Sequence, residues 1–265
     1  MSYDDLVLVS ALSGVAGLLL LERLRPARAL PHVPWWKIRG ALFYALGFVL
    51  AGAAPLSWDH LLAPHRLLDL SGLGVLAGAA VGLLVLEFFN YWWHRALHGS
   101  DLLWRFVHQM HHSVERMDVA GAMVRTPLGT LAWAAVGSLA LVLVVGLRTE
   151  AVVLANYVLF FLDCLTHANL RTPRWLGYLV ARPEMHGIHH QKGVHRFNYA
   201  TIPVWDMLFG SYRNPVTWDG EAGFYLGASG RIVDMLLGRD VSQPPRRRAM
   251  GEVARRDTDR RGATA

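Results

Sequence analysis

The sequence predicts an all-α protein whose helices cross a membrane four or five times and carry a helical cap on one side. Three observations support this prediction: an apolar composition, five long apolar runs, and a one-sided distribution of basic residues. Of the 265 residues, 53% are hydrophobic and 17% are Asp, Glu, Lys or Arg, whereas a soluble domain carries roughly 25% charged residues. The only cysteine, Cys164, excludes a disulfide scaffold.

The five apolar runs match or approach the length of a membrane span, since about 20 apolar residues cross a bilayer core. They cover residues 6–21, 41–58, 73–93, 127–147 and 151–165. The last run is short and contains Asp163. The first is not a cleaved signal peptide, because Asp4 and Asp5 precede it where a positive segment belongs. We therefore expect an integral membrane protein whose first span starts outside.

The loops between these runs differ sharply in basic residues. Residues 59–72 hold only Arg66, and the hairpin tip between the last two runs holds only Arg148. All other Lys and Arg lie on the opposite side, which is then the cytoplasmic side. This sorting accounts for the net charge of +6, and we expect no nucleic-acid partner. Few Lys beside many Arg, Ala and Gly suggest a bacterial protein and hence the inner membrane.

The sequence predicts a single folded domain followed by a tail. We expect one membrane domain over residues 1–241 and a disordered, Arg-rich tail over residues 242–265. Small residues within 73–89 and 127–143 would allow close helix packing, which we favour over a slot for an acyl chain.

Nine of the thirteen histidines fall in four clusters, and the predicted topology places all four clusters on the cytoplasmic side. They are His94 and His98; His108, His111 and His112; His167; and His186, His189 and His190. Positions i, i+3 and i+4 of a helix share one face, so each cluster should direct its imidazoles one way. Nine imidazoles are too many for one tetrahedral metal and suit two metals with four or five nitrogens each. His32, His60 and His65 are interpreted as structural.

The ligand type narrows the chemistry. The sequence has no H-E-x-x-H motif of a zinc protease, and no Glu or Asp recurs within the clusters as in carboxylate-rich di-iron bundles. Two irons held by imidazoles beside a bilayer suit O2 activation on a lipid C–H bond. Such a reaction consumes two electrons, and the chain has neither a dinucleotide glycine fingerprint nor a haem-attachment motif, so the reductant should be a separate protein.

Together the motifs resemble those of the fatty acid hydroxylase/sterol desaturase superfamily of integral-membrane non-haem di-iron enzymes. That superfamily shows H-x-x-x-H, H-x-x-H-H, a later H-x-N and a second H-x-x-H-H, as do His94 to His98, His108 to His112, His167 to Asn169, and His186 to His190 here. Asn198-Tyr199 and the stretch 205–210 are also similar to the family's closing motifs, so the resemblance covers residues 82–214.

The resemblance implies a membrane domain under a cytosolic helical cap, with two iron ions held by the nine histidines. It also implies O2-dependent hydroxylation or desaturation of a lipid, with electrons from a ferredoxin- or cytochrome b5-like protein and its reductase. Beside the ligands, Glu87 could orient an imidazole or cap a helix end. Asn169, Asn198 and His195 could orient ligands or bind a metal-bound water.

Lipid hydroxylation is the leading hypothesis, and desaturation by the same family is the nearest alternative. A metal transporter or other metal-binding membrane protein would place its ligands near the bilayer midplane, which the one-sided clusters disfavour. A membrane zinc hydrolase is a further alternative, distinguished by the metal it contains.

Overall fold

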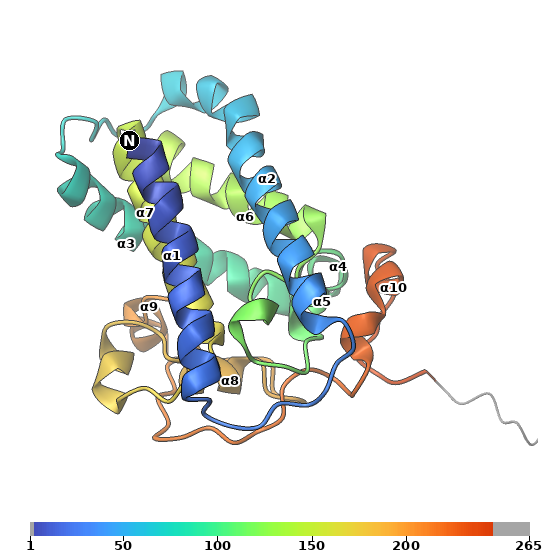
Figure 1. Cartoon of the computed structure of the whole chain (residues 1–265). Coiled ribbons are helices and arrows are strands. Elements are labelled where there is room, and N and C mark those ends of the chain that lie inside the picture. Colours follow the sequence, from blue (N-terminus) through green and yellow to red (C-terminus); the bar gives the residue numbers. More distant parts are fainter. Residues whose placement is uncertain (1–2, 246–265) are drawn as a thin grey trace, which may run out of the picture.

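Long helices that stand side by side form one end of the molecule, and short helices and loops gather at the other end (Figure 1). This computed structural model describes residues 3–245, without the side chains of residues 3–5 and 8. Within that part the chain forms helices and no strand, so the predicted all-α class is confirmed. The predicted disorder of the tail concerns residues that lie, from 246 on, outside the described part.

Four helical segments in the described part are long and apolar enough to cross a membrane: Trp36–His65, Val75–Gly99, Pro127–Val144 and Thr149–His167. They correspond to α2 (Trp36–Leu62) with η1 (Ala63–His65), α3 (Val75–Gly99), α6 (Pro127–Ser138) with the π-helical η4 (Leu139–Val144), and α7 (Thr149–His167). These segments contain most of the second to fifth predicted runs. The first run lies in α1 (Tyr3–Leu24), which is not among the four. The chain is therefore an integral membrane protein.

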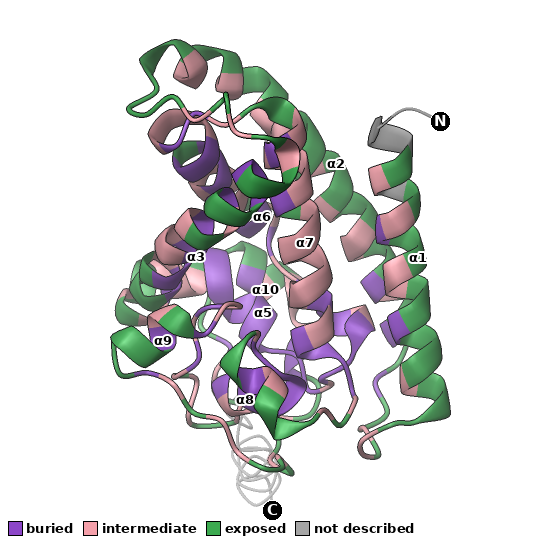
Figure 2. Cartoon of the chain, turned by 90° about the vertical axis from the view of Figure 1, so that its left-hand side faces the viewer, coloured by how far each residue is buried: buried purple, intermediate pink, exposed green. Residues whose placement is uncertain are grey.

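The outer surfaces of the long helices agree with this environment. Much of α1 and α2 is exposed, as the green ribbon of Figure 2 shows, and the exposed side chains include Leu42, Val49 and Leu56. A lipid-facing helix exposes such residues because acyl chains, not water, cover them.

The interior of the bundle is closely packed where α3 meets α7 and η4. A Cβ atom at Gly82 would lie 2.6 Å from Leu147 Cδ1 and 3.1 Å from Leu141 Cδ2. At Gly78 it would lie 3.0 Å from Ala151 Cβ. The small residues at these two positions thus serve close packing, as expected.

Short elements build the end that carries the histidine motifs. They are α4 (Asp101–Leu103), the π-helical η2 (Trp104–His108), α5 (Gln109–His112), η3 (Val119–Gly121), η5 (Arg174–Tyr178), α8 (Pro183–His189), α9 (Val204–Leu208), η6 (Ala228–Gly230) and α10 (Ile232–Leu236). An apolar core that includes Trp36, Met110, Val114, Phe224 and Met235 joins this end to the start of α2. The C-terminal segment is fastened to α5, since Gln109 Nε2 donates to the Arg239 carbonyl and Val241 N donates to Gln109 Oε1.

Candidate metal centre

Four separate stretches of chain bring the nine histidines together. The last turns of α3 carry His94 and His98, and the last turn of α7 carries His167. The η2–α5 segment contributes three histidines, and the α8 region contributes the remaining three. Because α3 and α7 end on the same side of the bundle, all nine side chains meet there.

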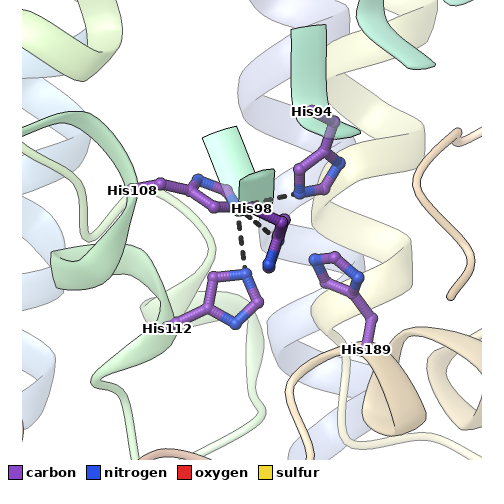
Figure 3. Close-up of side chains that lie close together, drawn as sticks. All are labelled: His94, His98, His108, His112 and His189. Atoms are coloured by element: carbon purple, nitrogen blue, oxygen red, sulfur yellow. Dashed lines mark hydrogen bonds between the residues drawn. The ribbon is translucent and has the colours of Figure 1, made fainter. Parts of the chain in front are cut away.

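The nine imidazoles separate into two groups, each with ligand atoms within 4.8 Å of one another. The five-histidine group contains His94, His98, His108, His112 and His189, and Figure 3 shows these rings facing a common centre. The four-histidine group contains His111, His167, His186 and His190. The predicted number of four or five nitrogens for each of two metals agrees with this division.

The two H-x-x-H-H motifs are shared between the groups, which corrects the expectation that each motif points one way. His108 and His112 join the five-histidine group while His111 joins the other; His186 and His190 join the four-histidine group while His189 crosses over. At 100° per residue, position i lies about 40° from i+4 and about 60° from i+3, and these two lie about 100° apart. The first and last histidines of each motif therefore stay together, and the middle one faces the neighbouring group.

Backbone carbonyls fix the proton on Nδ1 of three of these rings. His94 Nδ1 lies 2.7 Å from the Tyr199 carbonyl oxygen, His189 Nδ1 lies 2.8 Å from that of Phe197, and His167 Nδ1 lies 2.8 Å from that of Asp163. A carbonyl only accepts hydrogen bonds, so Nδ1 must donate and Nε2 must carry the lone pair. Each of these rings thus presents a metal-binding nitrogen to its group.

The crowding of Nε2 atoms fits a cation. His108 Nε2 lies 2.8 Å from His94 Nε2, 3.0 Å from His112 Nε2 and 3.2 Å from His98 Nε2. A neutral imidazole has one N–H, so a single proton on His108 cannot satisfy three facing nitrogens. His189 Nε2 is buried with no hydrogen-bond partner in the described structure. A metal ion binds several lone pairs at once, and the residues present therefore fit one.

Burial keeps these imidazoles neutral, as metal ligands must be. Desolvation first, and then the neighbouring histidines, holds the pKa well below its usual range at His108, His112 and His189. In the other group, desolvation followed by neighbouring charges does the same at His111, His186 and His190. Both groups could therefore hold a metal ion at neutral pH.

Glu87 lies two helical turns before His94 and contacts none of the nine imidazoles in the described structure. Its carboxylate accepts from Asn90 Nδ2 at 2.8 Å and from the backbone N–H groups of Thr201 and Ile202. These two amides follow Tyr199, whose carbonyl orients His94. Glu87 thus holds the loop whose Tyr199 carbonyl contacts His94, and it lies in the middle of α3 and not at a helix end.

The two predicted asparagines fasten loops beside the ligands and do not contact them. Asn198 Nδ2 donates to the Met185 carbonyl, and its Oδ1 accepts from Arg213 N. Asn169 Nδ2 donates to the Arg28 carbonyl, while its Oδ1 is buried without a partner in the described structure.

His195 lies directly against the site. Its Nδ1 is 3.1 Å from His112 Nδ1, and burial lowers the pKa of His195 to about 4. It is not a member of either group and can orient His112 by sharing a proton with it. The three histidines interpreted as structural, His32, His60 and His65, are exposed and stand outside both groups.

Asp206 is a positioning residue that the sequence pattern did not single out. Its fully buried carboxylate accepts from Tyr199 N and Ala200 N at 2.8 Å, and from Ser211 Oγ at 2.7 Å. Like Glu87, it holds this loop by accepting from its backbone N–H groups, and it does so from α9. The only available signal was its place in the closing motif at residues 205–210.

A known protein family matches the region of the chain that contains the histidine motifs. A family model described as fatty acid hydroxylase matches residues 79–211, about half of the chain, close to the predicted range 82–214. All nine histidines lie within the matched residues.

Relatives with assigned activities match between 49% and 65% of the chain. An ornithine lipid hydroxylase of Rhizobium tropici is 31% identical over 65% of this chain and 52% of that protein. A Delta(7)-sterol-C5(6)-desaturase of Nicotiana tabacum is 29% identical over 59% of this chain and 57% of that protein. A sphinganine C4-monooxygenase of Arabidopsis thaliana is 26% identical over 49% of this chain and 52% of that protein. The matches thus span about half the length of these relatives, and no solved structure matches the chain.

Proposed function

The chain belongs to the fatty acid hydroxylase family, and from that membership we propose that it is a membrane oxidoreductase that uses two iron ions and O2 to hydroxylate a C–H bond of a lipid. The observation that carries the proposal is the meeting of nine imidazoles, eight buried and that of His98 half-buried, in two adjoining groups at the ends of membrane-spanning helices. Neither group contains a carboxylate.

Each histidine group would hold one iron. His94, His98, His108, His112 and His189 would bind the first, and His111, His167, His186 and His190 the second. Imidazoles suit zinc and copper as well as iron, so the choice of iron rests on the family. Bound iron would supply the activation of O2 and the oxidation of an unactivated C–H bond, which no side chain can perform.

The protein's own residues orient the imidazoles and shape the approach to them. Carbonyls of Tyr199, Phe197 and Asp163 hold three rings in the tautomer that binds metal. On the side of the spans, the Trp133 ring of α6 packs edge-on against His94 at 5.7 Å between ring centroids. An apolar wall at this point favours a hydrocarbon chain arriving from the bilayer and disfavours water.

Desaturation of a lipid is the alternative, and the similarity to a sterol desaturase favours it specifically. Both outcomes begin with removal of a substrate hydrogen, and they differ in where the substrate carbon is held relative to the metals. The similarity to an ornithine lipid hydroxylase makes a bacterial membrane lipid the first substrate class to test.

The electrons would come from a separate ferredoxin- or cytochrome b5-like protein with its reductase. We place the protein in a bacterial inner membrane with the histidine groups on the cytoplasmic side, because almost all Lys and Arg lie on the side of these groups.

The test combines metal content with product analysis. The full chain, reconstituted in lipid nanodiscs, should contain two irons and take up O2 when a reductase and donor are added. Mass spectrometry of host lipids from cells with and without the protein should reveal a lipid that has gained one oxygen atom. A lipid that has lost two hydrogens would identify the desaturase instead, and zinc with lipid hydrolysis would refute both.

A further inference from the structure

The short helix α9 presents an apolar face with no cover in the described structure. Leu208 is 67% exposed, Val204 42% and Met207 39%, and the adjoining Phe209 is also exposed. Four large apolar side chains are thus exposed within six residues, and exposed apolar patches mark contact with another phase or partner.

The position of α9 along the bundle indicates what covers this face. Trp205 Nε1 donates to the Leu84 carbonyl at 3.2 Å, and the Trp205 ring lies 5.0 Å from that of Phe88. Leu84 and Phe88 belong to the span α3, and Leu84 precedes His94 by ten residues, about 15 Å along a helix. Helix α9 therefore lies against the side of a span, at about the level of the short helix α5 that carries two of the histidines (Figure 1).

The surface of α3 continues the patch of α9. Val81 and Leu84 of α3 are exposed large apolar residues, and the Phe209 ring packs 4.9 Å from that of Trp92. The first charged side chain beyond this point is Arg95, whose guanidinium lies over the Trp92 ring at 5.4 Å. At a bilayer boundary, tryptophan side chains usually lie at the level of the headgroups, and arginine side chains lie beyond them on the cytoplasmic side.

We propose that α9 is an interfacial anchor embedded in the leaflet that borders the metal centre, with Val204, Met207 and Leu208 in contact with acyl chains. The bilayer is the occupant because the patch is continuous with a membrane-spanning helix and carries no exposed charge between Leu84 and Trp92.

The opposite face of α9 connects this anchor to the ligands. Asp206 lies on that face and accepts from Tyr199 N, and the Tyr199 carbonyl holds His94 Nδ1. One face of this five-residue helix would thus contact lipid, and the other face helps to orient a ligand. The bilayer would fix the depth of the loop that carries Tyr199 relative to the membrane surface.

Cysteine labelling tests the placement directly. The native Cys164 is fully buried, so Leu208→Cys and Val204→Cys give single sites for a fluorescent probe in the full chain, reconstituted in phosphatidylcholine vesicles. Val216→Cys is the matched control, because Val216 is 68% exposed and lines a pocket with Arg28 and Arg171, which follow the ends of α1 and α7 in the chain.

Lipids brominated on their acyl chains should quench the probe at Leu208 and Val204 several times more strongly than the probe at Val216. Aqueous iodide should show the reverse order. Iodide quenching at Leu208 equal to that at Val216, without quenching by brominated lipid, would mean that the face meets water or a soluble partner and would overturn the proposal. The measurement needs neither metal nor turnover, so its result is independent of the proposed activity.

Discussion

His112 and His190 stack ring on ring, with centroids 4.2 Å apart and planes inclined by 17°. His112 belongs to the five-histidine group and His190 to the four-histidine group, so this contact joins the two. The groups are therefore adjoining parts of one centre. Because no histidine belongs to both groups, substitution of one histidine can alter one group separately.

Removing one ligand should empty one group selectively. His111→Ala takes one of four imidazoles from its group, and we expect the protein to insert normally, lose one of its two metal ions and lose all activity. His189→Ala should deplete the other metal, since its buried Nε2 has no hydrogen-bond partner in the described structure and is left to bind a metal. Elemental analysis of purified protein measures both effects. His65→Ala, at an exposed position outside the groups, is the control, and turnover that survives in His111→Ala would contradict the assignment.

Glu87 should matter for metal binding although it contacts no ligand. Glu87→Ala leaves the amides of Thr201 and Ile202 unpaired, which loosens the Tyr199 carbonyl and its hold on His94. Loss of such an outer contact typically lowers metal affinity about 10- to 100-fold. Glu87→Gln keeps an oxygen for both amides and should restore most of the affinity. A competition titration with a chelator compares the three proteins, and equal affinities for Ala and wild type would exclude this role.

His195 should position His112 without binding metal. Its backbone is left-handed, with φ of 42°, a conformation that asparagine tolerates better than alanine. Both His195→Asn and His195→Ala should weaken the metal of the five-histidine group, because both remove the contact with His112 Nδ1. Only the alanine variant should also lose about 1 kcal/mol of unfolding free energy from backbone strain. If neither variant changes the metal content, His195 only fills space.

Sequence reasoning identified the nine histidines because two independent patterns agreed on them. Their spacing marked them as clusters, and an even number of spans between the second and third clusters required them to share one side. The distribution of the two motifs over two groups follows from helix geometry, since His108 and His112 lie closer in angle than His111 and His112. Which histidines of the two motifs meet in one group depends on how α5 packs against α8, and no local sequence pattern predicts that packing.

The contacts that orient the ligands were harder to predict from the sequence than the ligands themselves. Phe197 and Tyr199 act through backbone carbonyls, which carry no side-chain signature. Their directions depend on left-handed backbone at His195, Phe197 and Asn198, with φ of 42°, 70° and 48°. Glycine usually signals such positions, and none occurs here. Only the resemblance to a family pattern drew attention to this loop.

Two glycines of α2 should respond oppositely to the same substitution. A Cβ at Gly40 would lie 2.5 Å from the Ala120 carbonyl oxygen, whereas nothing lies within 4 Å of a Cβ at Gly52. The Ala120 backbone belongs to η3, which Trp36 and Tyr44 of α2 also hold by hydrogen bonds to Asp118 and to the Val119 carbonyl. This backbone cannot move aside freely, so Gly40→Ala should cost about 1–3 kcal/mol of stability.

Gly52→Ala should instead gain about 0.5–1 kcal/mol, because alanine restricts the unfolded backbone and fits a helix without a clash. Thermal unfolding in detergent, followed by circular dichroism, compares the two variants with the parent protein. Residues 113–118 link α5 to η3, so Gly40→Ala should also lower metal content while Gly52→Ala leaves it unchanged. Equal melting temperatures for both variants would mean that α2 does not press against η3 as the structure describes.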